Sequence, residues 1–510
     1  MTDSTRVEWR PWGPEAFEEA TRTDTPILLS LTATWCGACH EMDARTYSEP
    51  RIAANINDSF VPIRVDVDRH PRVRERYNMG GFPTTAFLTP EGKLLSGATY
   101  LGPDGLRQVL DSIRELWTDK GADAGRVPRA LADDPTPRGD LSDSIEANLA
   151  GQLTEQFDPR HGGWGTDAKF PMPRTVEFAL KRERQQALQT LDAIAQHLHD
   201  PVDGGFFRFA TSRDWSDIRY EKVLPENAAL LRAVANAYLY TGDDAYRQPA
   251  ARTVEYLTDT LWTAIAVGGS QGPGQGAGYY SLAADERADH ESPRTDLTVF
   301  AGGNALAVDA LLTYYSYTDD ETAKTYAKRI LTALEDELVD TKSGVVTHYR
   351  TADETGDTHL LEDAARVVGA WTRAYQVLGD DHALDVASRV ADETIDELQV
   401  DSGAFRDGPA RGEGLCDRPL YPIDTAVEFA DALLDLSILV DDPAYRERAT
   451  EALEAFAGAA DRIGVQVAGY GSVAARLCGE PLVIEVGGPA GSALHRAACR
   501  VADHERVVVP

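Results

Sequence analysis

The sequence predicts a multidomain protein in which an α/β domain is followed by an all-α domain. Its 510 residues are more than one hydrophobic core normally serves, and 43% of them are hydrophobic, as in ordinary globular proteins. Strand and helix patterns alternate up to about residue 120, whereas helical patterns with an internal repeat begin at residue 141. We therefore expect an α/β domain at 1–120, a linker at 121–140, a helical barrel at 141–462 and a small α/β tail at 463–510 packed on the barrel.

The elements of the first domain follow the order β-α-β-α-β-β-α. Short apolar runs such as residues 26–33 predict buried strands, and apolar residues on one face of 106–117 predict a closing helix. In chain order we expect a strand at 26–33, a helix from Cys36 interrupted at Pro50, a strand at 61–67, a helix around 72–77, two strands joined by the turn at 90–92, and the closing helix.

Repeated helical hairpins organise the second domain. An apolar helix that ends in an acidic turn recurs at 228–244, 304–320, 365–381 and 427–442, and glycine-aromatic turns close the hairpins. Open helical solenoids repeat every 34–47 residues or so, whereas these units lie about 60 residues or more apart. The spacing therefore favours a closed barrel of the (α/α)6 type. Residues 119–140 are rich in Pro, Gly and Asp without periodicity, which indicates a linker.

The charge balance and the hydropathy pattern disfavour nucleic acids and membranes as partners. The chain carries 83 acidic and 50 basic residues, a net charge of −33, and only eight of the basic residues are Lys. This composition indicates a halophilic protein, because concentrated salt screens the self-repulsion of an acidic surface. No basic stripe suggests nucleic-acid binding, and no run of 18 apolar residues suggests a membrane span. The N-terminus has no basic start followed by an apolar run, so no secretory signal is expected. Five cysteines in 510 residues are not a disulfide framework, so we expect a cytoplasmic location.

The strongest chemical motif is Cys36-Gly37-Ala38-Cys39, preceded by Trp35. It lies where a buried strand ends and a helix begins, so Cys36 is expected to meet unpaired helix N–H groups that stabilise a thiolate. Cys36 would then attack a disulfide, and Cys39 would resolve the mixed disulfide.

A second motif, Gly81-Phe82-Pro83-Thr84, strengthens this interpretation because the two together are similar to those of thioredoxins. That resemblance implies a cis Pro83 lying against the cysteine pair and shaping the substrate groove. Thioredoxins usually carry an Asp six residues before the first cysteine, where this chain has Ser30, so His40 is a candidate for the proton role. The expected catalytic set is Cys36, Cys39, Pro83, His40 and Trp35, with no cofactor and no metal.

Three other interpretations of the motif stay open. Cys36 to His40 also matches the CxxCH haem-attachment pattern, although a strand and Trp35 precede it and no export signal is present. The same residues could bind a metal, but structural zinc needs four ligands and no second cysteine pair completes the set. The pair could also be vestigial in a domain kept for packing or binding.

Segments along both domains resemble the spermatogenesis-associated protein 20 family, in which a thioredoxin-like domain is fused to a six-hairpin glycosidase-type barrel. The segments that carry the resemblance are 26–42, 61–73, 80–103, 157–171, 219–231, 360–365 and 481–488. The chain departs from the family at Gly37-Ala38, where the family has His-Trp, at Phe82, where it has Trp, and at Arg219, where it has His.

The resemblance implies that the barrel could hold a sugar ligand. Barrels of this type often carry a carbohydrate cleft lined by carboxylates and histidines, which supply acid and base groups. The candidates are Glu221, Glu226, Asp296, Glu362, Asp363, Asp424, His290, His348 and His359. The leading hypothesis is a thiol–disulfide oxidoreductase that acts on a protein thiol or disulfide, or with a reductase. The alternatives are a glycosidase- or epimerase-like enzyme of carbohydrate metabolism and a non-catalytic binding protein.

Overall fold

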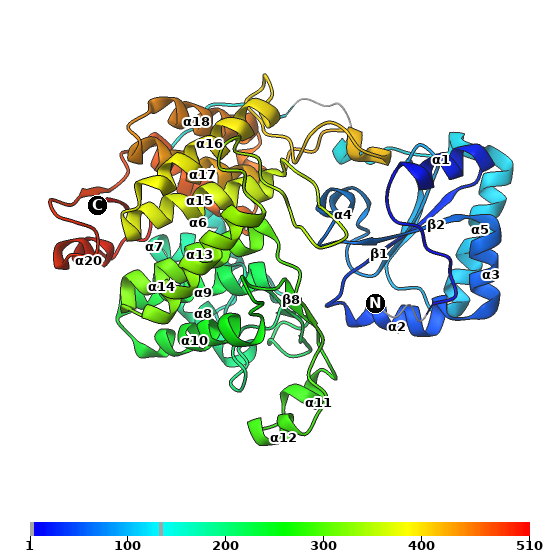
Figure 1. Cartoon of the computed structure of the whole chain (residues 1–510), viewed down its shortest axis with the longest axis horizontal. Coiled ribbons are helices and arrows are strands. Elements are labelled where there is room, and N and C mark those ends of the chain that lie inside the picture. Colours follow the sequence, from blue (N-terminus) through cyan, green and yellow to red (C-terminus); the bar gives the residue numbers. More distant parts are fainter. Residues whose placement is uncertain (1–4, 132–135) are drawn as a thin grey trace. The chain divides into compact units, whose positions relative to one another are not determined.

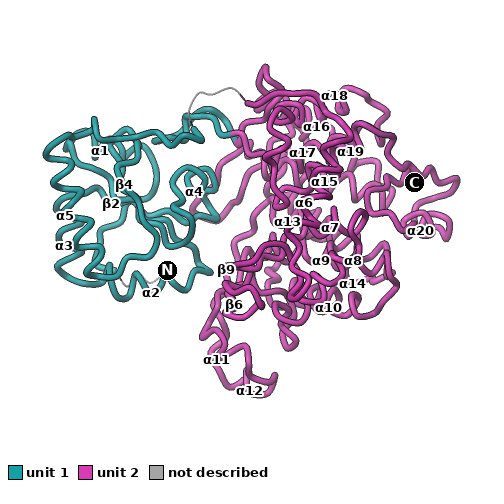
Figure 2. Tube along the Cα trace, turned by 180° about the vertical axis from the view of Figure 1, so that it is seen from behind, with its two compact units in different colours: residues 1–134, 408–420 teal, residues 135–407, 421–510 magenta. Residues whose placement is uncertain are grey.

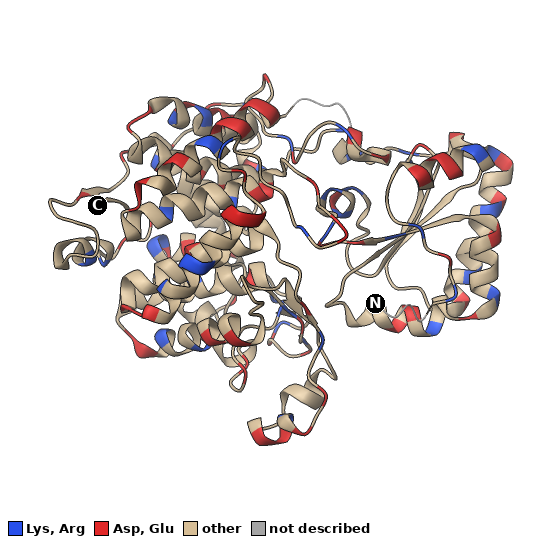
Figure 3. Cartoon of the chain, viewed as in Figure 1, with Lys and Arg blue, Asp and Glu red and all other residues tan. Residues whose placement is uncertain are grey.

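The computed structural model describes residues 5–131 and 136–510, which divide into two compact units (Figure 2). Unit 1 comprises residues 1–134 together with 408–420, and unit 2 comprises 135–407 and 421–510. Acidic side chains are spread over the helices of both units (Figure 3). None of the described helices is long and apolar enough to cross a membrane.

Unit 1 is an α/β domain built on a mixed four-stranded sheet with the strand order β2-β1-β3-β4 (Figure 1). Strand β1 is parallel to β2 and antiparallel to β3, which is in turn antiparallel to β4. Every residue of β1 and β3 is buried, as expected of central strands with apolar sequences. The strands are β1 (Ile27–Thr32), β2 (Val61–Asp66), β3 (Thr84–Leu88) and β4 (Leu94–Ala98).

The helices of unit 1 confirm the predicted element order and add one helix at the start. The added helix, α1, buries Ala16, Phe17 and Ala20, too few apolar positions to stand out in the sequence. The helix that begins after Cys36 passes through a π-helical turn before α3 begins at Pro50. The helices are α1 (Pro14–Thr23), α2 (Gly37–Met42), the π-turn Asp43–Tyr47, α3 (Pro50–Ser59), α4 (Pro71–Tyr77) and α5 (Pro103–Lys120).

Residues 408–420 complete unit 1, although they lie more than 270 positions beyond the rest of it. Two buried arginines of α4 hold this segment by its backbone: Arg72 donates to Pro409 O at 2.7 Å, and Arg76 donates to Leu415 O at 2.7 Å. Tyr77 of the same helix accepts a hydrogen bond from the N–H of Leu415 at 2.9 Å. The segment is therefore an integral part of unit 1.

Unit 2 is a barrel in which an inner ring of helices is covered by an outer set. Successive inner helices pack on one another in the order α7, α9, α13, α15, α17, α19, and α19 packs back on α7 to close the ring. Each inner helix has an outer partner, and α6 from the start of the unit covers α19 from its end. The inner helices are α7 (Pro173–Arg182), α9 (Leu224–Thr241), α13 (Ala301–Thr318), α15 (Leu361–Leu378), α17 (Ile423–Leu439) and α19 (Gly469–Cys478). The outer helices are α6 (Ser144–Gln156), α8 (Arg184–His197), α10 (Asp244–Glu255), α14 (Glu321–Glu337), α16 (Asp381–Leu398) and α18 (Pro443–Ala457).

The glycine-aromatic turns join each outer helix to the next inner one through a short antiparallel bridge. Examples are Phe157 with Trp164, and His199 with Phe206. Gly204 has a φ of +76° in the second turn, and a Cβ there would lie 2.1 Å from Arg252 O, so only glycine fits. Lys222 reaches into the same turn and donates to the carboxylate of Asp200 at 2.8 Å, which fastens the turn to the inner helix that follows.

Short elements between the helices and a small terminal motif complete unit 2. Two strands near the end of the chain pair in parallel, and a short helix connects them, which gives a β-α-β tail. The short elements are β5 (Phe209–Ala210), β6 (Ile218–Arg219), β7 (Lys222–Val223), β8 (Ser270–Gln271), α11 (Ala277–Tyr280), α12 (Ala284–Ala288), β9 (Thr295–Asp296), β10 (Val483–Glu485), α20 (Ala493–Cys499) and β11 (Val507–Val509).

The sequence-based segment boundaries differ from these units in three places. Residues 408–420, expected in the barrel, belong to unit 1 because the arginines of α4 bind their backbone. Residues 121–131, expected in the linker, stay in unit 1, where Arg126 pairs with Leu94 next to β4. The rest of the expected linker includes residues 132–135, which lie outside the described residues. Helix α19, expected in the C-terminal tail, is an inner helix of the barrel because Val473 and Ala474 pack in its hydrophobic core.

Candidate functional site

The cysteine pair of unit 1 forms a disulfide at the start of α2. Cys36 is the N-cap of this helix, and its Cα lies 5.2 Å from that of Cys39. The backbone N–H of Cys39 donates to the Sγ of Cys36 at 3.1 Å. Both cysteines are buried. The strand-to-helix junction therefore places Cys36 Sγ against a helix N–H group, as the sequence predicts.

Pro83 lies at the start of β3 and is buried, with a cis peptide bond to Phe82. The preceding turn is held by Asn78, whose Oδ1 accepts hydrogen bonds from the N–H groups of Gly80 and Gly81, both at 2.9 Å. Thr84 closes the turn by donating from its hydroxyl to Gly81 O at 2.7 Å. These local contacts fix the backbone on both sides of Pro83.

Trp35 links the cysteine pair to the ends of β2 and β3. Its indole Nε1 donates to Asp68 Oδ2 at 2.7 Å, and its ring meets Phe82 edge-on at 5.9 Å between centroids. Trp35 thus lies between the acidic residues that follow β2 and the residue that precedes Pro83. The structure brings Trp35 and Phe82 together from separate sequence motifs.

A neutral polar cluster occupies the sheet position where thioredoxins usually have an Asp. Ser30 is buried in β1 beside Thr85 of β3, and the Tyr47 hydroxyl lies 3.0 Å from Thr85 Oγ1. Burial raises the pKa of Tyr47, and hydrogen bonds with Thr85 and Ser30 oppose that rise. The cluster therefore stays uncharged at neutral pH. His40 is half-buried in α2, and its backbone N–H donates to Cys36 O at 3.2 Å.

The structure brings His348, Glu362 and Asp363 together near Arg366, whereas the other barrel residues expected to act on sugars lie elsewhere. His348 and Asp363 form a buried pair at 2.8 Å, whereas His359 pairs with Glu393. The carboxylates of Glu221 and Glu226 share Arg208 at 3.7 and 3.4 Å, Glu362 pairs with Arg366, Asp296 accepts from the N–H of Thr298, and His290 is exposed. Among the described residues that line the central cavity, Asp424 is the one sequence candidate.

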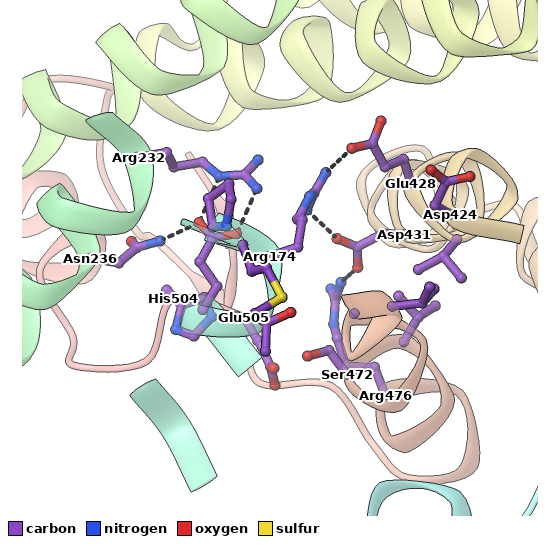
Figure 4. A pocket seen from close by; sticks show the side chains of 18 of the residues that line it. Arg174, Arg232, Asn236, Asp424, Glu428, Asp431, Ser472, Arg476, His504 and Glu505 are labelled. Carbon is purple, nitrogen blue, oxygen red and sulfur yellow. Dashed lines mark hydrogen bonds and ion pairs between the residues drawn. The ribbon is translucent and has the colours of Figure 1, made fainter. Parts of the chain in front are cut away.

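About half of the residues that line the central cavity of the barrel are Asp, Glu or Arg, and among these the sequence analysis named Asp424 alone. The cavity has a volume of about 260 Å³ and lies inside the ring of inner helices. Helix α17 contributes Asp424, Glu428, Asp431 and Asp435, which share one face because they are spaced at i, i+4, i+7 and i+11. Figure 4 shows Arg174 reaching toward this acidic face, with Arg476 beyond it.

Opposite charges alternate around the cavity wall. Arg174 lies 3.4 Å from Glu428, and Arg476 forms ion pairs with Asp431 and Asp435. Burial raises the pKa of Asp435, although the nearby Arg476 opposes that rise.

The opposite side of the wall has a similar network. Arg232 donates to both carboxylate oxygens of Glu177, at 2.8 and 2.7 Å, and also pairs with Asp309. Asn236 donates to Glu177 at 3.0 Å. Burial alone would raise the pKa of Glu177, but the charge of Arg232 outweighs it and lowers the pKa. The buried carboxylates of Glu177 and Asp309 are therefore held by the guanidinium group of Arg232.

The C-terminal tail reaches the cavity through His504, Glu505 and Arg506. Glu505 pairs with the end of α7, at 2.5 Å from Arg182 and 2.9 Å from Lys181. Burial alone would raise the pKa of Glu505, but these cations outweigh it and lower the pKa to about 2. Because the folded pKa lies below the unfolded one, the stabilisation is complete above about pH 4.5 and is lost as the pH falls toward 2.

The substitution Glu505→Gln should therefore lower the free energy of unfolding at pH 7 by about 3 kcal/mol. Urea denaturation at pH 7 and at pH 3 measures the effect, with Glu155→Gln on the exposed side of α6 as the control. The difference in free energy of unfolding between wild type and Glu505→Gln should be smaller at pH 3. At that pH Glu505 of the wild type is mostly protonated in the unfolded chain but still ionised in the folded one. A gap that stays constant between the two pH values would contradict the ion-pair account.

Comparison with known proteins agrees with this architecture. The family model Thioredox_DsbH, described as a protein of unknown function, DUF255, matches residues 1–133. Spermatogenesis-associated protein 20 of Homo sapiens is 30% identical over 292 residues, which cover 50% of this chain and 37% of that protein. Thioredoxin-1 of Drosophila melanogaster is 36% identical over 81 residues, which cover 16% of this chain and 70% of that protein. The chain thus spans little more than a third of the length of spermatogenesis-associated protein 20.

Solved structures similar to this chain cover about 60% of it. A sugar epimerase from a ruminal bacterium matches with a TM-score of 0.49 and 15% identity, over 60% of this chain and 84% of its own. Cellobiose 2-epimerase from Spirochaeta thermophila matches with a TM-score of 0.47 and 18% identity, over 60% of this chain and 83% of its own.

The sequence matches and the folds of the two units lead to the same assignment. The Thioredox_DsbH model matches residues 1–133, which lie in the cysteine-bearing unit, and the mixed sheet with its helix-capping cysteine pair is the fold expected for that unit. The chain therefore belongs to the thioredoxin family through its N-terminal unit and is a homologue of spermatogenesis-associated protein 20, with an (α/α)6-type barrel as its second unit.

Proposed function

We propose that this protein is a thiol–disulfide oxidoreductase that uses the Cys36 and Cys39 pair. The observation that carries the proposal is the disulfide at the start of α2, where the N–H of Cys39 donates to Cys36 Sγ. In the reduced protein the same N–H would stabilise a Cys36 thiolate, which is the reactive form of a cysteine. Phe82, whose ring meets that of Trp35 next to the pair, and Pro83 would supply the surface on which a substrate docks.

The proposed reaction transfers two electrons from the dithiol to a disulfide substrate. The Cys36 thiolate attacks one substrate sulfur, the substrate S–S bond breaks, and the other sulfur leaves as a thiolate that takes up a proton. Cys39 then loses its proton and attacks Cys36 Sγ, which closes the Cys36–Cys39 disulfide and releases the second substrate thiol. A dithiol reductant returns the pair to the reduced state, so its partner is a reductase or a reduced thiol pool.

The proton that Cys39 gives up needs an acceptor, and the cluster at Ser30 has no carboxylate to supply one. We assign this role to His40, which directly follows Cys39 in α2. We also propose that the protein acts in the cytoplasm and in concentrated salt, as expected from the sequence. In the cytoplasm, glutathione and thioredoxin pools keep thiols reduced. The pair would therefore alternate between dithiol and disulfide rather than remain a permanent structural disulfide.

Turnover of a protein disulfide tests the proposal. With dithiothreitol as the electron donor, the wild-type chain should speed the reduction of insulin above the rate of dithiothreitol alone. Cys36→Ser should abolish that increase, and Cys478→Ser, which removes an exposed cysteine of unit 2, should leave it unchanged. Equal rates for wild type and Cys36→Ser would overturn the proposal.

A further inference from the structure

Exposed apolar side chains are concentrated in the β-α-β tail of unit 2. Among the described residues, eight large hydrophobic side chains are exposed, and four of them lie between residues 482 and 501. They are Leu482, Val483, Leu494 and Val501. Figure 1 and Figure 2 both show α20, the helix of this tail, at the outer margin of unit 2. Because exposed apolar residues that gather in one place mark interaction sites, the tail has the composition of an interaction surface.

Strand β10 of this tail has one hydrogen-bonded edge and one open edge. It pairs with β11, and no third strand of the described residues joins this sheet. Leu482 O and the N–H of Val486 form hydrogen bonds with β11, both at 2.9 Å. Because backbone groups alternate in direction along a strand, the N–H and C=O groups of Val483 and Glu485 face away from β11. These four groups form an edge that can pair with another strand.

The opposite edge of the small sheet is covered by the barrel. β11 packs on α15 and α17, and the N–H of Val508 donates to the side chain of Gln376 at 2.9 Å. Val507 and Val508 are buried. The sheet can therefore grow only at β10. A single open edge that pairs with its own copy gives a closed pair of chains rather than a fibre.

The sequence of β10 is complementary to itself when two copies run antiparallel. With Ile484 facing its counterpart, Val483 of each copy faces Glu485 of the other. The outward N–H and C=O groups of these residues then form four hydrogen bonds between the strands. Leu482 faces Val486, so aliphatic side chains meet aliphatic ones. Each Glu485 faces a valine, and the pairing therefore places no like charges directly opposite each other.

Helix α20 adds apolar surface to one face of this sheet. Ala498 and Cys499 form a small core with Val508, and Ile484 packs against it. Antiparallel pairing about Ile484 places both copies of α20 on the same face of the extended sheet. Leu494 lies on α20 and is 59% exposed, so its burial against a second copy would stabilise the pair.

We propose that this protein forms a homodimer through antiparallel pairing of β10 with β10 of a second copy. The two tails then share a four-stranded sheet in the order β11-β10-β10-β11. This interface uses residues of unit 2 alone and is independent of the cysteine chemistry proposed above. Each copy carries a net charge of −33, so repulsion opposes the pairing and concentrated salt weakens that repulsion. The dimer should therefore become more stable as salt is added.

Sedimentation velocity of the full chain over a range of protein concentrations tests the proposal. The wild type should change from monomer to dimer as its concentration rises. The dimer Kd should be lower in about 1 M KCl, where the Debye length is about 3 Å, than in about 0.1 M KCl. A chain that stays monomeric in both salts would overturn the proposal, and so would a Kd that rises with salt or an assembly that grows beyond a dimer.

Two variants test whether the dimer forms through the tail. Val483→Pro removes an outward N–H and leaves the bonds to β11 in place, so the fold should be retained. The dimer loses two hydrogen bonds, and its Kd should rise about 30-fold. Leu494→Ser should raise the Kd about tenfold. The matched control is Leu297→Ser, which removes a leucine of similar exposure, 53%, outside the tail and should leave the Kd unchanged. A wild-type Kd in both tail variants would overturn the proposal.

Disulfide cross-linking tests the register without weakening the strand. Ile484→Cys should place two cysteines opposite each other with Cα atoms about 4.5 Å apart, within the range of roughly 4.4–6.8 Å that a disulfide allows. Val483→Cys places its cysteine opposite Glu485 instead, out of reach of its counterpart. Both variants are made with Cys478→Ser, which removes an exposed cysteine. After oxidation, Ile484→Cys should run as a covalent dimer on a non-reducing gel and Val483→Cys as a monomer. No covalent dimer of Ile484→Cys, or equal cross-linking of both variants, would contradict the antiparallel pairing.

Discussion

Cys39→Ser should trap a mixed disulfide on Cys36, whereas Cys36→Ser should trap none at this site. Without Cys39 the intermediate loses its intramolecular attacking thiol and can be resolved only by thiols from solution. Because a positioned group reacts far faster than a free one, the adduct should last roughly 100-fold longer or more than in wild type. Intact mass after mixing the reduced protein with oxidised glutathione measures the adduct.

The remaining cysteines provide the control for this experiment. Cys416 and Cys499 are buried, but Cys478 is exposed and could form an adduct of its own. Burial raises the pKa of the Cys478 thiol, which lowers its thiolate fraction at neutral pH. Each variant is therefore also made with Cys478→Ser. A glutathione adduct of equal yield on Cys39→Ser and Cys36→Ser would contradict the assignment of Cys36 as nucleophile.

Arg76→Leu should destabilise unit 1 by about 3–5 kcal/mol, because it removes the donors that hold residues 408–420. Arg76 is 3% exposed and donates to the carbonyl oxygens of Leu415, Arg72 and Arg418 at 2.7, 3.0 and 2.7 Å. Leucine fills part of the space but donates to none of these oxygens, so Leu415 O would keep the N–H of Arg418, at 3.2 Å, and would lose its charged donor. Urea denaturation and hydrogen exchange of β1 and β3 measure the change.

The matched control is Arg114→Leu on α5. Arg114 is half-exposed, and its guanidinium lies 3.7 Å from Asp111, a surface ion pair worth less than about 1 kcal/mol. Because α4 leads directly into the turn before Pro83, Arg76→Leu should also slow reduction of the disulfide substrate. If Arg76→Leu and Arg114→Leu had equal effects on β3 exchange, the anchoring role of α4 would be wrong.

The features of unit 1 that the sequence predicts are local ones. The run at 26–33 becomes β1 because it is apolar throughout, and Cys36 caps α2 because the motif follows that strand directly. The attachment of residues 408–420 has no local pattern, since it depends on Arg72 and Arg76 meeting carbonyl groups from a distant part of the chain. Only the folded chain brings those groups together.

The charged cavity was open to prediction but was missed. The acidic residues of α17 recur at helical spacing in an otherwise apolar helix, which indicates a charged stripe facing inward. The large excess of Asp and Glu in the chain hides this stripe among ordinary surface carboxylates. The arginines that form ion pairs with this stripe come from α7, α15 and α19, and no single stretch of sequence shows that pairing.

Redox equilibration of the full chain is the most direct test of the central claim that the cysteine pair is redox-active. The protein is equilibrated with dithiothreitol or glutathione buffers, free thiols are alkylated, and intact mass counts them, with Cys36→Ser as the reference. The account predicts that two thiols disappear together at a potential in the span of roughly −120 to −270 mV covered by known thioredoxin-fold catalysts. Cysteines that stay free in glutathione buffers, or that oxidise one at a time, would contradict it.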